Sequence, residues 1–156
     1  MVQLVPMNPE EFRLFRDSYA PEYAQDHVRI GSWDPAEAVA LAKGRIDELL
    51  PRGTETPDQY LRKIVDQVTG ERVGEVWYSF QRAGARLSCY IHWIGIYQAH
   101  RGRGIATTVL RQVEKEARRA GARRLALNVF ASNSSAAALY AKLGFSPGAT
   151  FMVKPL

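Results

Sequence analysis

The chain has 156 residues, a length that favours a single domain large enough to bury its own core. Its 46% hydrophobic and 24% charged residues are typical of a globular protein, and its one cysteine, Cys89, excludes an internal disulfide. The three histidines, His27, His92 and His100, are too scattered for a zinc site, so we expect no metal.

The N-terminal segment 1–12 lacks the basic start and long apolar stretch of a signal peptide. The best apolar run, residues 38–42, is far too short to cross a bilayer, so we expect a cytoplasmic protein that does not act at a membrane. The net charge of +5 is compatible with nucleic-acid binding, but no basic run with interleaved aromatic residues is present. A polyanionic cofactor explains the charge equally well, and no nucleic-acid partner is expected.

Hydrophobic periodicity, helix caps and turn residues divide the chain into helices and strands. In chain order, the expected elements are a strand over 2–7, a helix from Asn8-Pro9 that Pro21 kinks or ends, a loop over 27–33, a helix from Asp34-Pro35 to the stop at 51–53, strands over 59–67, 72–81 and 86–97, a helix over 104–121, a strand over 124–130, a helix over 134–143 and a strand over 151–156.

The order β-α-α-β-β-β-α-β-α-β(β) predicts an α/β (α+β) fold with a mixed, mostly antiparallel central sheet flanked by helices. The short turns between the strands over 59–67, 72–81 and 86–97 predict an antiparallel meander. The helix over 104–121 forms a crossover, which makes the strand over 124–130 parallel to the strand before it.

Residues 101–106, with the sequence RGRGIA, lie between a predicted strand and a predicted helix. Gly102 and Gly104 lack a Cβ, so a ligand could approach the backbone closely. The first N–H groups of the helix have no intrahelical partner and present donors to an anion, which predicts a phosphate site. Taken alone, the loop is more simply a turn that connects strand to helix. Its spacing is neither GxGxxG nor GxxxxGK[ST], which disfavours dinucleotide and nucleoside-triphosphate binding.

A second stretch makes the sequence resemble the GNAT superfamily of acyl-coenzyme-A-dependent N-acetyltransferases. The family's phosphate-loop pattern, Q/R-x-x-G-x-G/A, is matched by residues 101–106. Its pattern N-x-x-A…LY-x-K-x-GF is matched by Asn133, Ala136, Leu139, Tyr140, Lys142, Gly144 and Phe145. The two motifs lie at the family's usual separation, and the resemblance is strongest over 86–145. It implies a GNAT-type fold and one N-acetyltransferase domain over 1–156.

The resemblance implies that acetyl-CoA is the cosubstrate and that its pantetheine arm lies where the two parallel strands splay apart. Backbone groups of Ile94 and Ile96 would pair with the pantetheine, Gly95 would form a bulge there, and Asn133 would contact the arm. The phosphate loop would hold the pyrophosphate through Arg101, Gly102, Arg103, Gly104, Ile105 and Ala106.

The resemblance also implies that Tyr140 is the general acid that faces the sulfur of coenzyme A. A phenol has a pKa of about 10 and a thiol about 8.5, so full proton transfer is uphill by roughly 2 kcal/mol. Hydrogen-bond stabilisation of the departing thiolate is therefore the safer role. The alternative is that Tyr140 only packs beside Leu139 and Leu143.

The base that takes the proton of the amine is not evident. Many family members carry a glutamate on the strand before the phosphate loop, and this chain has Tyr90 at about that place. His92 shares a strand face with Tyr90 and could act directly or through water. Glu75, on the neighbouring strand, is the other candidate. A hydrogen-bonded strand histidine and a paired carboxylate are the plainer interpretations of these two residues.

The segment 19–33 lies where this family usually builds the wall of the acceptor site. Its carboxylates would suit a cationic amine, although a solvated loop explains them almost equally well. We expect Trp33, Trp77 and Trp93 in the core or in walls, and Cys89 as a small buried hydrophobic residue.

We therefore interpret the chain as an acetyl-CoA-dependent N-acetyltransferase in which a primary amine attacks the thioester directly. The N–H group near Ile96 would polarise the thioester carbonyl. A non-catalytic acyl-CoA-binding or regulatory domain on the same fold is the alternative, because no base is assigned. Three points stay open: the acceptor, which is a small molecule or a peptide, the acyl-chain preference, and the existence of a homodimer.

Overall fold

The computed structural model describes residues 1–156, which form two compact units. The first unit comprises Met1–Met7 and Thr54–Val129, and the second comprises Asn8–Gly53 and Phe130–Leu156. In neither unit does a helix combine the length and the apolar composition that crossing a bilayer requires.

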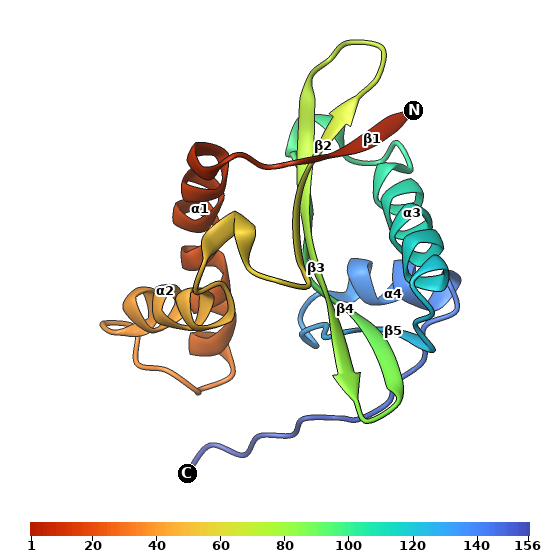
Figure 1. Cartoon of the computed structure of the whole chain (residues 1–156). Helices are drawn as coiled ribbons and strands as arrows, with labels where there is room; N and C mark the ends of the chain where they lie inside the picture. The colour runs from red at the N-terminus through yellow and green to blue at the C-terminus, as the bar shows by residue number, and fades with distance from the viewer. The chain divides into compact units, whose positions relative to one another are not determined.

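The first unit is built on a five-stranded sheet in the order β1-β2-β3-β4-β5. Its strands are β1 (Val2–Pro6), β2 (Gln59–Asp66), β3 (Arg72–Ala83), β4 (Arg86–Ile96) and β5 (Arg124–Leu127). The first four strands pair antiparallel, and β5 pairs with β4 in parallel after the crossover through α3 (Ile105–Arg119). The mixed sheet, the meander and the parallel crossover are confirmed (Figure 1).

Helix α3 runs along one face of this sheet (Figure 1). Its apolar stripe is buried and consists of Val109, Leu110, Val113 and Ala117. On the same side, the hydroxyl of Tyr78 on β3 donates a hydrogen bond to the carboxylate of Glu116 on α3. Burial and the carboxylate both raise the pKa of Tyr78, so its hydroxyl stays protonated. The helix is thus held by an apolar stripe, by this polar pair and by a 2.9 Å hydrogen bond from Nε2 of Gln112 to the carbonyl of Val2.

The backbones of β3 and β4 come together at Gly74 and Gly95. A Cβ on Gly74 would overlap the carbonyl oxygen of Gly95, and a Cβ on Gly95 would lie 2.8 Å from the indole of Trp93. The bulge expected at Gly95 is wrong, because Gly95 pairs in regular register with Glu75. Glycine is required there because the Trp93 ring lies where a side chain would project.

The second unit contains α1 (Pro9–Arg29) and α2 (Ala38–Leu49), which pack on one another, and α4 (Ser134–Lys142). Asn8 and Glu11 form the capping box that starts α1, with hydrogen bonds of 2.8 and 2.9 Å to each other's backbone N–H groups. The guanidinium of Arg16 on α1 donates two hydrogen bonds, of 2.7 and 2.6 Å, to the carboxylate of Asp47 on α2.

The expectation that Pro21 ends the first helix is wrong, because α1 continues to Arg29. The proline removes one helical hydrogen bond. However, the stack formed by Phe15, Tyr19 and Tyr23, with centroid distances of 5.4 and 5.6 Å, continues past it. Packing of this aromatic stripe outweighs the lost bond. The second helix also begins later than expected, since residues 35–37 form a turn before Ala38.

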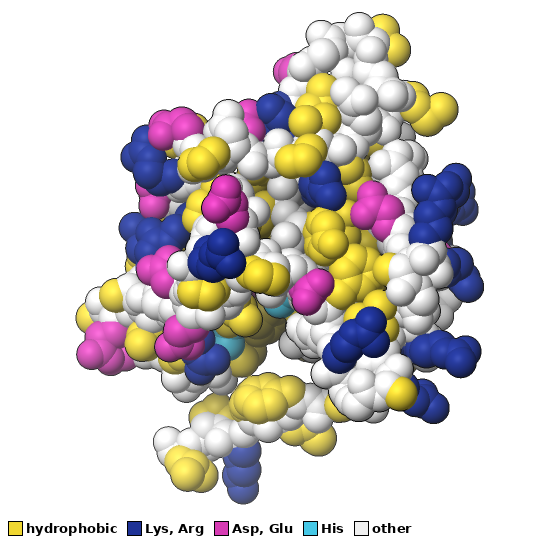
Figure 2. All heavy atoms as spheres, in the orientation of Figure 1, with side chains coloured by type: hydrophobic (Ala, Val, Ile, Leu, Met, Phe, Trp, Pro, Cys, Tyr) yellow, Lys and Arg dark blue, Asp and Glu magenta, His cyan; other side chains and the backbone are white.

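The strand expected over 151–156 is wrong, and the strand expected over 124–130 ends at Leu127. The C-terminal residues are extended but hydrogen-bond to no neighbouring strand, and strand propensity alone cannot form a sheet. Their hydrophobic side chains are exposed, as the yellow side chains of the C-terminal tail in Figure 2 show: Phe151, Met152, Val153 and Leu156.

We predict that Gly74→Ala destabilises the protein by about 3 kcal/mol or more, because the new Cβ would force β3 away from β4. Gly44→Ala is the matched control, since Gly44 lies within α2 with open space around it and should gain roughly 0.5–1 kcal/mol. Urea unfolding of both variants measures the difference. A Gly74→Ala protein as stable as the control would contradict the close approach described above.

Candidate functional site

The loop between β4 and α3 presents a series of unpaired backbone donors. Gly102 and Gly104 adopt left-handed conformations, with φ of 76° and 73°, and open space lies where their side chains would be. The N–H groups of residues 102–107 have no acceptor within the chain, and the first bond of the α3 ladder runs from the Thr108 N–H to the Gly104 carbonyl. Consecutive free N–H groups at a helix start bind anions such as phosphate.

Two arginine side chains hydrogen-bond this loop to the last residue of β4 and to the turn that follows it. The Nε of Arg101 donates to the carbonyl of Ile96 at 2.8 Å, and Nη2 of Arg103 donates to the carbonyl of Ala99 at 3.2 Å. Both side chains are exposed, and each keeps further N–H groups free for a ligand. The arginines therefore shape the loop and add positive charge to it.

At the C-terminal end of β4, before the loop, one edge of the strand has no other strand beside it. β5 pairs with β4 only as far as Leu127, opposite Ile91. The N–H of Tyr97 donates to β3 at 2.9 Å. Because backbone groups of successive strand residues point to opposite edges, the N–H groups of Ile94 and Ile96 point away from β3. These groups lie on the edge of β4 beside which β5 no longer runs, and an extended ligand could pair with them there.

His92 is the extra residue of a bulge in β4, since the register of β3 with β4 shifts between Trp77 and Tyr78. Its imidazole stacks on Trp77 with a centroid distance of 4.3 Å, and its Nε2 shares a 2.8 Å hydrogen bond with the hydroxyl of Ser79. Burial lowers the pKa of His92 to about 4. The imidazole is neutral at pH 7 and is a weak base.

Glu75 is a buried carboxylate on β3, directly opposite Gly95 of β4. It forms an ion pair of 3.4 Å with Arg72 and accepts a 3.3 Å hydrogen bond from the hydroxyl of Tyr97. Burial and this carboxylate raise the pKa of Tyr97. Glu75 thus lies one strand away from the free β4 edge, already paired with a cation and a donor.

The second unit carries Tyr140 on α4. Gly144, with φ of 91°, ends α4 and turns the chain so that the N–H of Phe145 donates to the carbonyl of Tyr140 at 3.0 Å. The Phe145 ring then packs edge-on against the Tyr140 ring at 5.6 Å. Burial raises the pKa of Tyr140. The last two residues of the motif therefore hold the tyrosine ring in place.

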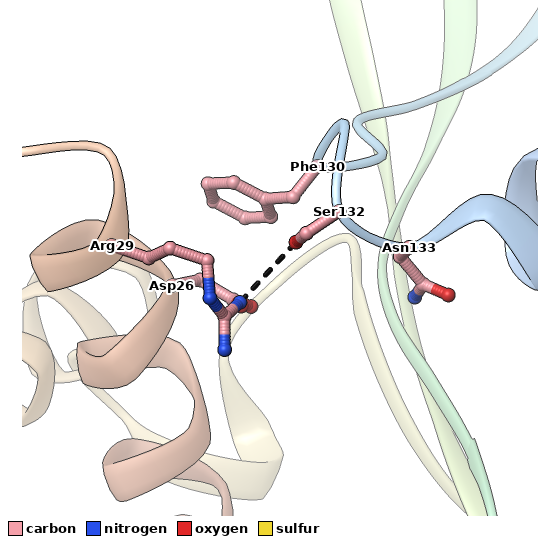
Figure 3. A pocket seen from close by; sticks show the side chains of 5 residues that line it. All are labelled: Asp26, Arg29, Phe130, Ser132 and Asn133. Carbon is pink, nitrogen blue, oxygen red and sulfur yellow. Dashed lines mark hydrogen bonds and ion pairs between the residues drawn. The ribbon is translucent and has the colours of Figure 1, made fainter.

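Asn133 is the N-cap of α4, because its side-chain oxygen accepts a 3.3 Å hydrogen bond from the N–H of Ala136. It also lines a cavity of about 390 Å³ within the second unit, together with Asp26, Arg29, Phe130 and Ser132 (Figure 3). The segment 19–33, expected to form the acceptor wall, contains Asp26 and Arg29, whereas the sequence did not single out Phe130 or Ser132. These two lie within three residues of Asn133, and that proximity was the only available signal.

The remaining singled-out residues have structural surroundings. Cys89 is buried, and burial raises its thiol pKa to about 12, which makes it a poor nucleophile. Trp77 is fully buried, and Trp93 covers Gly95. Trp33 stacks on His27 with a centroid distance of 4.1 Å.

Comparison with known proteins relates this chain to one family. The sequence model of the acetyltransferase (GNAT) family matches residues 13–145. The uncharacterized N-acetyltransferase YycN of Bacillus subtilis is 35% identical over 155 residues, 99% of each chain. The crystal structure of the Bacillus subtilis protein YycN covers 100% of this chain and 99% of its own, with a TM-score of 0.92.

A second Bacillus subtilis relative, the uncharacterized N-acetyltransferase YdgE, is 33% identical over 143 residues, 92% of this chain and 90% of its own. A Pyrococcus furiosus structure shares the fold with a TM-score of 0.75 at 23% identity, over 100% of both chains.

We predict that His92 makes the protein less stable as the pH falls. Its pKa is lower in the folded protein than the ordinary value near 6.5, so the unfolded chain takes up the proton first. The free energy of unfolding should fall by about 2 kcal/mol between pH 7.5 and pH 5 from this residue. Urea unfolding at both pH values should show a smaller fall in His92→Gln, which can keep a bond to Ser79. An unchanged pH dependence in the variant would contradict the buried, neutral histidine.

Proposed function

Since the chain belongs to the acetyltransferase (GNAT) family, we propose that it transfers the acetyl group of acetyl-CoA to a primary amine. The observation that supports this most is the set of free N–H groups over residues 102–107, at the position of the family's phosphate-loop motif. An anionic ligand suits these donors, and coenzyme A carries a pyrophosphate.

The residues of the first unit fit coenzyme A in two further respects. The free edge of β4 offers two N–H groups to acetyl-pantetheine, as an added strand would pair: that of Ile94 to an amide carbonyl of the arm and that of Ile96 to the thioester carbonyl. Arg101 and Arg103 add charge beside the pyrophosphate. In the second unit, Asn133 keeps its amide NH₂ group for the arm while its oxygen caps α4.

The proposed reaction needs no covalent intermediate on the protein. The lone pair of the neutral amine attacks the carbonyl carbon of the thioester, a C–N bond forms and the C–S bond breaks. The electron pair of that bond stays on sulfur, which then takes a proton, and the nitrogen gives up its extra proton. The N–H of Ile96 donates to the carbonyl oxygen as negative charge develops on it.

Tyr140 acts on the departing sulfur. Because burial raises the pKa of its hydroxyl above the ordinary value near 10, the hydroxyl keeps its proton at neutral pH. It can therefore donate a hydrogen bond to the thiolate, whereas complete proton transfer from this hydroxyl is even less favourable than from a free phenol.

The acceptor's own pKa decides how much help deprotonation needs. A lysine-like amine with a pKa of about 10.4 is neutral at pH 7 at a cost of about 4.6 kcal/mol, and an α-amine at a cost of about 1 kcal/mol. With a pKa of about 4, His92 is poorly matched to this task. A carboxylate is ordinarily no stronger a base, and Glu75 is already paired with Arg72, so we propose that water accepts the proton of the nitrogen.

We predict that Gly104→Ala weakens acetyl-CoA binding about tenfold, because a Cβ at this left-handed position obstructs the close approach of a phosphate to the backbone. Gly121→Ala is the matched control. It has the same type of strain, with φ of 87° and open space, at the other end of α3. Titration calorimetry with acetyl-CoA should show a loss for the first variant only. Equal losses in the two variants would indicate strain rather than a binding site.

We predict that Tyr140→Phe lowers kcat more than about tenfold and leaves the Kd of acetyl-CoA unchanged, since only the donor to the thiolate is lost. The assay follows thiol release from acetyl-CoA with a panel of amines at several pH values. Tyr60→Phe, on the α3 side of the sheet, is the control and should keep full turnover. Full turnover in Tyr140→Phe would remove this residue from the reaction.

A further inference from the structure

The cavity in the second unit has a charged side chain that the proposed reaction does not use. Arg29 extends from the end of α1 into this cavity, where its Nη1 donates to Asp26 at 2.8 Å and to the hydroxyl of Ser132 at 3.3 Å. Figure 3 shows the guanidinium pointing toward Ser132, with the Phe130 ring beside it. The cavity volume of about 390 Å³ is within the range of small-molecule sites.

Apart from the second oxygen of Asp26, whose carboxylate is paired with Arg29, the groups left over in this cavity are donors. Arg29 uses only Nη1 in these bonds, so its Nη2 and Nε remain for a bidentate partner. The hydroxyl of Ser132 accepts from Arg29 and keeps its own hydrogen to donate. The oxygen of Asn133 caps α4, which leaves its NH₂ group. A fork of guanidinium donors with two neutral donors beside it matches a carboxylate.

The wall behind Arg29 is aromatic and uncharged. The ring of Phe130 packs edge-on against His27 at 5.8 Å, and His27 stacks on Trp33. Burial lowers the pKa of His27, so this imidazole is neutral at pH 7. The aromatic wall therefore adds no positive charge, and Arg29 is the cationic group that an anion would meet here.

The contacts of Arg29 with Asp26 and Ser132 contribute little to stability. An i,i+3 pair with Asp26 at the end of α1 would stabilise the helix by a few tenths of a kcal/mol. That pair needs no contact with Ser132, which lies 103 residues along the chain. Because exposed ion pairs contribute little to stability, Arg29 can be replaced without loss of the fold.

We propose that this cavity binds a carboxylate of the acetyl acceptor, and that the acceptor is an amine that also carries a carboxylate, such as an amino acid or a short peptide. Arg29 is then the residue that determines specificity. The proposal rests on the proposed acetyl transfer, since Asn133 belongs both to the cavity and to the motif assigned to coenzyme A.

The test compares acceptors that differ only in the carboxylate: glycine with glycinamide, and diglycine with diglycinamide. Thiol release from acetyl-CoA gives kcat and KM for the full chain and for Arg29→Gln, Arg29→Lys and Arg13→Gln. Arg13 is the control, an exposed α1 arginine paired with Glu10 at 2.6 Å. Without the negative carboxylate the amine has a lower pKa, so a larger fraction of each amide is neutral and able to attack. A preference for the acids therefore reports binding of the carboxylate and not ionisation of the amine.

We expect the wild type to prefer the acids about tenfold or more in kcat/KM. Arg29→Gln should lose this preference through KM, Arg29→Lys should retain part of it, and Arg13→Gln should retain all of it. The Kd of acetyl-CoA should be the same in all four proteins. When kcat/KM is compared per neutral amine, a higher value for diglycine than for glycine would identify a peptide acceptor, and the reverse a free amino acid.

Equal use of acids and amides by the wild type, or a preference that survives in Arg29→Gln, would overturn the carboxylate site and leave acetyl transfer intact. Binding of acetyl-CoA without thiol release for any amine would overturn the proposed transfer, and the carboxylate site with it.

Discussion

The pairing of β3 with β4 is the constraint on which the rest of the first unit depends. It runs from Gly74 to Ala83, and it requires glycine at Gly74 because of the backbone of Gly95 and at Gly95 because of the indole of Trp93. Because β3 holds β4 to its end while β5 stops at Leu127, the far end of β4 keeps one edge free. After a 3-10 turn at Gln98–His100 the chain enters the loop over 101–106, so a free edge and a set of free N–H groups follow each other along one segment.

The magnitudes show that neither feature suffices alone. A hydrogen bond to a charged group contributes about 1.5–3 kcal/mol net, so three loop N–H groups on a pyrophosphate supply roughly 4.5–9 kcal/mol. Association costs about 4–15 kcal/mol in lost translational and rotational freedom. Micromolar binding therefore needs additional contacts, and pairing of the pantetheine arm with Ile94 and Ile96 is the proposed source. A glycine loop without the free strand edge would hold phosphate only weakly.

Local chemistry was readable from the sequence, and long-range packing was not. Gly144 was predicted to follow the end of a helix because glycine tolerates the left-handed conformation that ends helices. Pro21 does not end α1, because aromatic stacking along the helix outweighs one lost hydrogen bond. The bulge at His92 accompanies stacking of its ring on Trp77 of the neighbouring strand. The residues next to His92 in the sequence carry no turn or glycine signal that would predict it. The Arg29 contact with Ser132 joins residues too far apart in sequence for periodicity to relate them.

The most direct test of the account is the detection of the acetylated acceptor itself. The purified chain is incubated with acetyl-CoA and an amine panel that includes glycine and diglycine, and mass spectrometry and thiol release are recorded on the same samples. The account predicts an acceptor that gains one acetyl group, in the same molar amount as the thiol released and in excess over the protein. Saturable acetyl-CoA binding with no acetylated product from any amine would contradict it and would favour a non-catalytic coenzyme-A-binding domain.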